Sequence, residues 1–152
     1  MVVIVIAGIM ITLAVISIGD RSASQLEQEG RRLNALMGMA HEESIMQSRE
    51  IGLAFSKTGY QFYEVGKDDK WQPIVKDETL RLREFPEGFK ITLYTDGEEV
   101  IIEPKMPENP AVYFFSSGET TPFELALKLA DYQQIITSDA FGEIKVGNIT
   151  EQ

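Results

Sequence analysis

MVVIVIAGIMITLAVISIGD, residues 1–20, is the stretch that decides the fold of this 152-residue chain. No side chain from Met1 to Gly19 is charged, and the first charges are Asp20 and Arg21. As an α-helix, which rises about 1.5 Å per residue, the run would reach roughly 28 Å, close to the thickness of the hydrocarbon core of a bilayer. Its apolar side chains fall on every face, whereas a soluble amphipathic helix keeps one face polar. The stretch therefore indicates a helix that packs in a membrane or in a fibre core, through Val2, Val3, Ile4, Val5, Ile6, Ile9, Met10, Ile11, Leu13, Val15, Ile16 and Ile18.

Two other interpretations of this stretch stay open. A secretory signal peptide would find small residues for cleavage at Ser22-Ala23-Ser24. However, the run has no basic residues before it, it is longer than the apolar region of most signals, and charges precede the cleavage position. The second alternative is a buried hairpin of two β-branched strands that turns at Ala7-Gly8.

Residues 20–50 predict that the helix continues beyond the apolar run. DRSASQLEQEGRRLNALMGMAHEESIMQSRE contains no proline and is rich in helix-forming residues. Apolar residues recur at helical spacing with charged residues mostly between them, which is typical of an amphipathic helix. The two halves together would span about 75 Å. The positions that we expect to pack against the rest of the protein or against another subunit are Leu26, Leu33, Leu36, Met37 and Ala40.

After residue 50 the sequence predicts an antiparallel β domain. IGLAFS (51–56) and YQFYEV (60–65) flank a short loop with a glycine, and FKITLYT (89–95) and EEVIIE (98–103) flank Asp96-Gly97. Both patterns are typical of β-hairpins. VYFF (112–115) and FELALKLA (123–130) suggest a third hairpin, followed by strands at 132–137 and 143–146. The expected fold class is thus α+β: a long N-terminal helix, then a sandwich or a strongly bent sheet.

Composition excludes several classes of function. The chain carries 14 basic and 24 acidic residues, a formal net charge of −10. No basic surface is expected to displace the counterions of nucleic acid, so nucleic acid is not an expected partner. The same balance argues against docking of the β domain on anionic lipid headgroups. There is no cysteine, which excludes disulfide bonds and thiol chemistry.

The sequence shows no convincing catalytic, metal or cofactor site. The single histidine, His41, lies among acidic residues of the predicted helix, and we interpret it as a surface residue. A zinc site would need further histidine or cysteine ligands at matched spacing. Ser116 and Ser117 lack the second histidine that a catalytic triad would require. Asp139 and Glu143 form only a loose pair, unlike the alternating ligands of a calcium loop. We therefore expect a protein that is not an enzyme and needs no cofactor.

The layout of a hydrophobic helix, an amphipathic continuation and a small β domain resembles the type IV pilin-like proteins. Four segments are similar, in order, to the H-type minor pseudopilins of type II secretion, the GspH family. They are LNALMGMAHEESIMQSREIGLAFSKTGYQFYEV (33–65), Trp71-Gln72-Pro73, LRLREFPEGFKITL (80–93) and PAVYFFSSGETTPF (110–123). Phe85 stands where that family usually has leucine. The resemblance covers essentially the whole chain.

The resemblance also implies a role and a location. It predicts a subunit of the secretion pseudopilus near the fibre tip, with other minor pseudopilins and the major pseudopilin as partners, which supports export of folded proteins across the outer membrane. Residues 1–19 would form the transmembrane and fibre-core part of the helix, 20–50 its amphipathic continuation, and 51–152 the periplasmic β domain. The protein would be a single-pass protein of the bacterial inner membrane, with the lipid bilayer as a further partner.

One feature departs from the family. Precursors of pilin-like proteins carry a basic leader that ends in glycine, and a glutamate soon after the cleavage site, whereas this sequence begins inside the apolar stretch at Met1-Val2-Val3. Either the sequence is truncated or the protein is not processed, and we favour truncation. Two rival functions remain: a minor pilin of a type IV pilus, and a membrane-anchored periplasmic binding module. A free anchor would need a flexible linker in residues 20–50, whereas a fibre subunit needs a continuous helix there.

Overall fold

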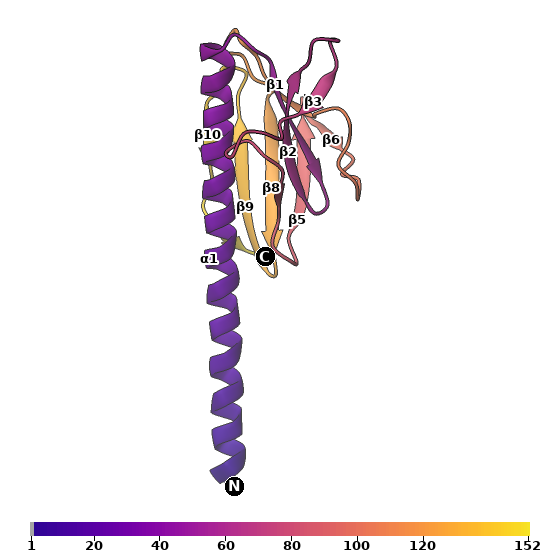
Figure 1. Cartoon of the computed structure of the whole chain (residues 1–152). Coiled ribbons are helices and arrows are strands. Elements are labelled where there is room, and N and C mark those ends of the chain that lie inside the picture. Colours follow the sequence, from indigo (N-terminus) through magenta and orange to yellow (C-terminus); the bar gives the residue numbers. More distant parts are fainter. Residues whose placement is uncertain (1) are drawn as a thin grey trace.

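In the computed structural model, a single helix, α1 (Val2–Met46), stands beside a domain of two antiparallel sheets (Figure 1). The structure describes the backbone of residues 2–152 and the side chains from Arg21 onward. The upper part of α1 lies against the domain, and its N-terminal part projects beyond it. The strands are β1 (Ile51–Ser56), β2 (Gly59–Val65), β3 (Trp71–Pro73), β4 (Arg83–Glu84), β5 (Lys90–Thr95), β6 (Glu98–Val100), β7 (Val112–Phe114), β8 (Phe123–Leu129), β9 (Tyr132–Ser138), β10 (Ile144–Val146) and β11 (Thr150–Glu151).

The strands divide into two sheets. Sheet A has the order β3-β2-β1-β7, with β4 also paired to β2, and sheet B has the order β10-β9-β8-β5-β6, with β11 paired to β9. The predicted fold class, an N-terminal helix followed by antiparallel sheets, is confirmed. The continuous helix leaves no room for a hairpin at Ala7-Gly8, so that alternative is wrong.

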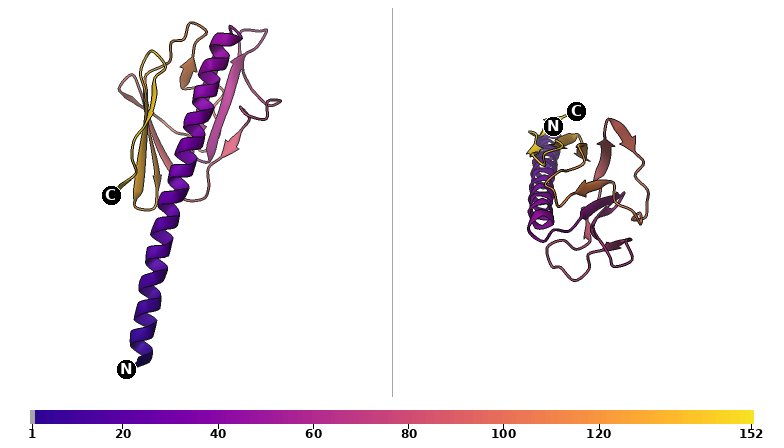
Figure 2. Two further views of the ribbon diagram at one scale, coloured as in Figure 1. Left: turned by 90° about the vertical axis from the view of Figure 1, so that its left-hand side faces the viewer. Right: turned by 90° about the horizontal axis from the view of Figure 1, so that it is seen from above.

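One hydrophobic core joins the two sheets and the helix. Leu125 and Leu127 of β8 and Ile136 of β9 are fully buried on the inner face of sheet B. α1 contacts β8, β9 and β10 and also reaches β1 and β7 of sheet A. The view from above shows the helix at one side of the domain, where it closes the space between the sheets (Figure 2).

Two of the predicted hairpins are confirmed. β1 pairs with β2, and β5 pairs with β6 across the two-residue turn Asp96-Gly97. Both turn residues have positive φ, 51° and 83°, which is the conformation that an Asp-Gly turn between twisted strands requires. The strands at 123–129, 132–138 and 144–146 also lie where the sequence predicts them.

The third predicted hairpin is wrong. β7 pairs with β1 of sheet A, whereas β8 pairs with β5 and β9 of sheet B. The two strands therefore belong to different sheets. The chain between them still turns back on β7, since Phe114 and Thr120 form an antiparallel bridge and the N–H of Thr121 donates to the carbonyl of Tyr113 at 3.0 Å, and it then crosses to sheet B. β8 makes its hairpin with β9, through a turn in which Ala130 has a positive φ of 52°.

Candidate functional site: the helix-docking face and the clamp at the helix end

One face of α1 is buried against the domain over about four turns. The five residues predicted to pack are all on this face and are at most 5% exposed: Leu26, Leu33, Leu36, Met37 and Ala40. They belong to the same core cluster as the inward side chains of both sheets. The structure thus places them between the helix and its own domain.

The apolar positions from Val2 to Ile18 lie outside the side chains that the structure describes, so their packing remains a prediction. Within the described residues, no helix meets the length and hydropathy needed for a membrane span.

The side chain of Gln134 packs closely against the helix at Gly30. Gln134 of β9 is 4% exposed, and its amide nitrogen donates to the carbonyl oxygen of Gly147 at 3.0 Å. A Cβ atom added to Gly30 would lie 2.0 Å from the side-chain oxygen of Gln134. Glycine at position 30 therefore allows a buried amide to approach the helix backbone, and the side-chain oxygen of that amide accepts no hydrogen bond from the described residues.

A second polar group lies beside it on the helix. Glu29 is 7% exposed and forms an ion pair with Arg32 one turn later. The phenol of Tyr60 on β2 lies close enough to Glu29 and Arg32 for both charges to affect its pKa. Burial raises the pKa of Tyr60, and the neighbouring Arg32 partly offsets this effect. The hydroxyl of Tyr60 makes no hydrogen bond of good geometry to any described residue.

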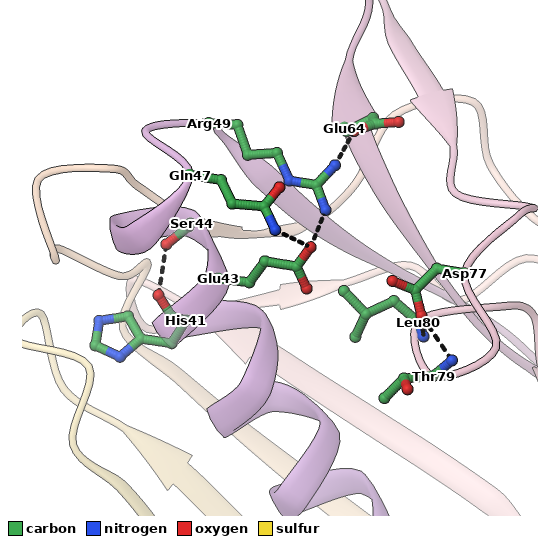
Figure 3. Close-up of polar contacts among 9 residues, drawn as sticks. All are labelled: His41, Glu43, Ser44, Gln47, Arg49, Glu64, Asp77, Thr79 and Leu80. Carbon is green, nitrogen blue, oxygen red and sulfur yellow. Dashed lines mark hydrogen bonds and ion pairs between the residues drawn. The ribbon is translucent and has the colours of Figure 1, made fainter.

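The end of the helix is held by a cluster of polar contacts (Figure 3). α1 ends at Met46, Ser48 adopts a left-handed conformation with φ 50°, and the amide of Arg49 donates to the carbonyl of Ser44 at 3.1 Å. The guanidinium of Arg49 pairs with Glu43 of the helix and with Glu64 of β2. One side chain therefore joins the last turn of α1 to sheet A.

A carboxylate ties the start of β1 to the crossing between the sheets. Glu50 accepts a hydrogen bond from the hydroxyl of Ser116 at 2.8 Å and one from its backbone N–H at 3.2 Å. Ser44 adds a bond from its hydroxyl to the carbonyl of Phe115 at 3.2 Å. Two of the segments that carry the family resemblance, 33–65 and 110–123, thus meet in space. We refer to the contacts of Arg49 and Glu50 together as the helix-end clamp.

His41 also lies in this region, where it is partly buried rather than fully exposed. Its Nε2 lies 2.8 Å from the carbonyl oxygen of Gly118, and its ring packs near Phe114 with centroids 6.4 Å apart. A Cβ on Gly142 would collide with the imidazole at 2.4 Å. No local sequence pattern indicates this contact, because Gly118 and Gly142 lie far from His41 in the chain.

The polar side chains near the end of α1 take part in structural contacts. The imidazole nitrogen of His41 is engaged by a backbone carbonyl, and the hydroxyl of Ser116 donates to Glu50. Asp139 accepts the backbone N–H groups of Phe141 and Glu143, both at 2.9 Å, so it stabilises its own turn. No group of three or more metal-ligating side chains gathers within the described part of the chain.

Comparison with known proteins identifies the architecture. Residues 29–140 match the family described as "Type II transport protein GspH". The chain is 33% identical over 138 residues to Type II secretion system protein H of Pseudomonas aeruginosa, which covers 84% of this chain and 77% of the relative. It is 29% identical over 154 residues to the protein of the same name from Aeromonas hydrophila, with coverages of 91% and 84%.

Solved structures share the fold. The crystal structure of the minor pseudopilin EPSH from the type II secretion system of Vibrio cholerae aligns with a TM-score of 0.72 and 20% identity, over 86% of this chain and 98% of that one. The solution structure of GspH from E. coli aligns with a TM-score of 0.66 and 17% identity, over 83% and 89%.

Proposed function

This chain belongs to the GspH family of type II secretion minor pseudopilins, and from this premise we propose that it is placed near the tip of the pseudopilus. There it would join the minor pseudopilins above it to the major pseudopilin below. The family is structural and not enzymatic, so the relevant chemistry is that of packing surfaces.

The division of the chain supports a role in a fibre. We propose that residues 1–19 lie in the inner membrane before assembly and in the fibre core afterwards, and that their apolar side chains from Val2 to Ile18 make those contacts. Residues 20–50 would carry the helix to the domain, and 51–152 would remain in the periplasm. The helix is continuous from Val2 to Met46, as a fibre subunit needs, and has no flexible linker.

The observation that carries the tip position is a set of exposed apolar side chains at the end of the domain away from the N-terminus of α1. Phe141 is 85% exposed and Met46 is 82% exposed. Phe141 sits on a turn that the carboxylate of Asp139 holds with two hydrogen bonds, so the ring is presented on an ordered backbone. Large aromatic side chains of this kind often anchor protein interfaces. A subunit placed one step further from the membrane would contact this end.

Single cysteine variants test the position in cells treated with a cross-linker that joins a thiol to a nearby amine, because the chain has no cysteine of its own. Phe141→Cys should cross-link to another minor pseudopilin in intact cells, whereas Lys67→Cys, at an exposed turn of sheet A, serves as the control. Cross-links from Phe141→Cys only to the major pseudopilin, in cells that still secrete, would refute the tip position.

A genetic test distinguishes a role in type II secretion from a role in a type IV pilus. Deletion of the gene in its host should abolish secretion of the enzymes that use the type II pathway, while motility that depends on type IV pili continues. Loss of motility with secretion intact would contradict a secretion role and favour a pilus.

A further inference from the structure

A groove opens along the edge of sheet B where β6 separates from β5. β5 pairs with β8 along its whole length, from Lys90 to Thr95, but with β6 only from Leu93 to Thr95. Beyond Val100 the chain turns towards sheet A, where the carbonyl of Glu103 accepts the N–H of Lys57. The first half of β5, Lys90–Thr92, therefore has a strand neighbour on one side only.

Backbone groups face this open side. In a hairpin with a two-residue turn, the residues that flank the turn exchange both backbone hydrogen bonds, and here they are Thr95 and Glu98. Because the direction of the peptide groups alternates along a strand, Leu93 and Ile91 point their N–H and C=O groups to the same side. Among the described residues, Ile91 has no backbone hydrogen bond outside the strand ladders. An unpaired N–H and C=O at a strand edge can pair with an added strand.

The groove at this edge has a volume of about 650 Å³ and is lined from both faces of β5. Phe89 and Ile91 line it from the core side, together with Val100 and Ile102, which are packed partly against the core. Ile101 at its rim is 87% exposed. The open edge is thus bordered by apolar side chains, as a site for a strand with alternating apolar residues would be.

The charge of the groove is opposite to that of the chain. Lys57, Lys90 and Lys128 line it with a single carboxylate, Glu99, although the protein has a net charge of −10. Lys90 and Lys128 lie directly opposite each other on neighbouring strands, an arrangement in which like charges repel. None of the three lysines takes part in an ion pair within the described side chains. The side chain of Lys128 donates only to the amide oxygen of Gln152, at 3.2 Å.

From the open edge, the apolar lining and the unpaired lysines, we propose that this groove binds an extended segment of a partner protein in which acidic and apolar residues alternate. The segment adds to β5 at Ile91 through backbone hydrogen bonds. Its acidic side chains relieve the repulsion between Lys90 and Lys128, and its apolar side chains cover Phe89 and Ile102. β5 and β6 lie on the side of the domain away from α1, so the helix leaves this site accessible (Figure 1). The site does not depend on the proposed tip position.

The test uses the full chain in detergent micelles, labelled with 15N, and two synthetic probes. One is a blocked heptapeptide of alternating glutamate and valine, and the other has lysine in place of glutamate. The acidic probe should shift the amide signals of Lys90, Ile91 and Thr92 and slow hydrogen exchange at Ile91. The lysine probe should bind at least tenfold more weakly.

A double charge reversal, Lys90→Glu with Lys128→Glu, keeps two like charges opposite each other and so preserves the strain of the original pair. It should weaken the acidic probe about tenfold and strengthen the basic one, as expected for a few partly exposed charge contacts. The matched control, Lys67→Glu with Lys70→Glu, makes the same change of net charge in an exposed turn and should leave binding unchanged.

Two results would overturn the proposal. One is equal binding of both probes, or no binding of either at millimolar concentration. The other is self-association of a Lys90→Thr, Lys128→Thr variant that binds no probe, because the lysines would then only protect an exposed edge from pairing with other chains.

Discussion

Replacement of Gly30 by alanine tests whether the helix is docked by a specific contact or only by its apolar stripe. Alanine is favoured over glycine inside a helix by about 0.8–1 kcal/mol, so helix propensity alone predicts a more stable protein. The structure predicts the opposite, because the new methyl group would lie 2.0 Å from the side-chain oxygen of Gln134 and 2.9 Å from its carbonyl carbon.

The loss of stability in Gly30→Ala can be estimated from the hydrogen bond and the packing that Gln134 would lose. Its side chain is buried and its amide donates to Gly147, so moving it costs about 1 kcal/mol for the hydrogen bond. Overpacking of a tight interior adds about 1–3 kcal/mol. After subtraction of the gain in helix propensity, Gly30→Ala should lower the free energy of unfolding by about 2 kcal/mol. For a chain of this size the midpoint of thermal unfolding would fall by roughly 4–8 °C.

Gly38 provides the matched control on the same helix. A Cβ added there meets nothing within 4 Å, so Gly38→Ala should stabilise the protein by about 0.5–1 kcal/mol. In a Gln134→Ala background the obstacle is gone, and Gly30→Ala should then stabilise by about 1 kcal/mol, which gives a coupling of about 3 kcal/mol between the two positions.

Urea unfolding of the full chain in micelles, followed by the fluorescence of the single tryptophan, Trp71, measures each value. If Gly30→Ala stabilised the protein as much as Gly38→Ala, Gln134 would not be held against the helix and the docking argument would fail.

Three further outcomes are expected. Leu33→Ala, at a position 1% exposed, should cost about 3 kcal/mol in the same urea titration, whereas Met39→Ala, at 47% exposed, should cost less than about 0.5 kcal/mol; equal costs would contradict the assignment of the buried face. Since burial raises the pKa of Tyr60, the stability that this phenol contributes is complete below about pH 10 and is lost as the pH rises above that value. Tyr60→Phe should therefore raise the midpoint of alkaline unfolding, and an unchanged midpoint would show that this phenol does not limit stability. Glu50→Ala should cost about 1–3 kcal/mol and speed hydrogen exchange at Ser116, whereas protection unchanged from the native protein would argue against the helix-end clamp.

Much of the fold could be predicted because its signals are local. The period of Leu26, Leu33, Leu36, Met37 and Ala40 indicates both the helix and its inner face, since residues three and four apart share a side. Asp96-Gly97 predicts its hairpin because few other residue pairs adopt positive φ at both positions. Each of these patterns is contained in a few adjacent turns or strands.

The partner of each strand was harder to predict from the sequence than the strand itself. β7 and β8 are neighbours in the sequence, and the loop between them contains a glycine, so a hairpin was expected there. β7 instead pairs with β1, whose residues lie some sixty positions earlier, and no local pattern reports such a partner. The turn after β8 has Ala130 at positive φ, and this turn is hard to predict because alanine rarely adopts that conformation.

The contacts that define the candidate site could not be predicted for the same reason. Glycine is unfavourable inside a helix, and only the approach of Gln134 explains its presence at position 30. Glu50 and Ser116 each belong to a segment that resembles the family, but the bond between them appears only when sheet A and the crossing loop are in place. The family resemblance therefore identifies the segments that contain these contacts, and the structure shows which residues of those segments bind each other.

The proposed role in a fibre requires that force pass from the helix to the β domain, and two features of this structure suit that requirement. The buried face from Leu26 to Ala40 runs for about 21 Å along α1, which spreads the load over several core side chains. We expect the close steric contact of Gln134 at Gly30 to resist sliding along the helix axis more than an apolar stripe alone would, because apolar contacts have little directionality. At the end of the helix, Arg49 and Glu50 join α1 to both the first hairpin and the crossing loop. The helix and the domain should therefore move as one body during assembly, and a variant that loosens Gly30 and Glu50 together should impair secretion more than either change alone.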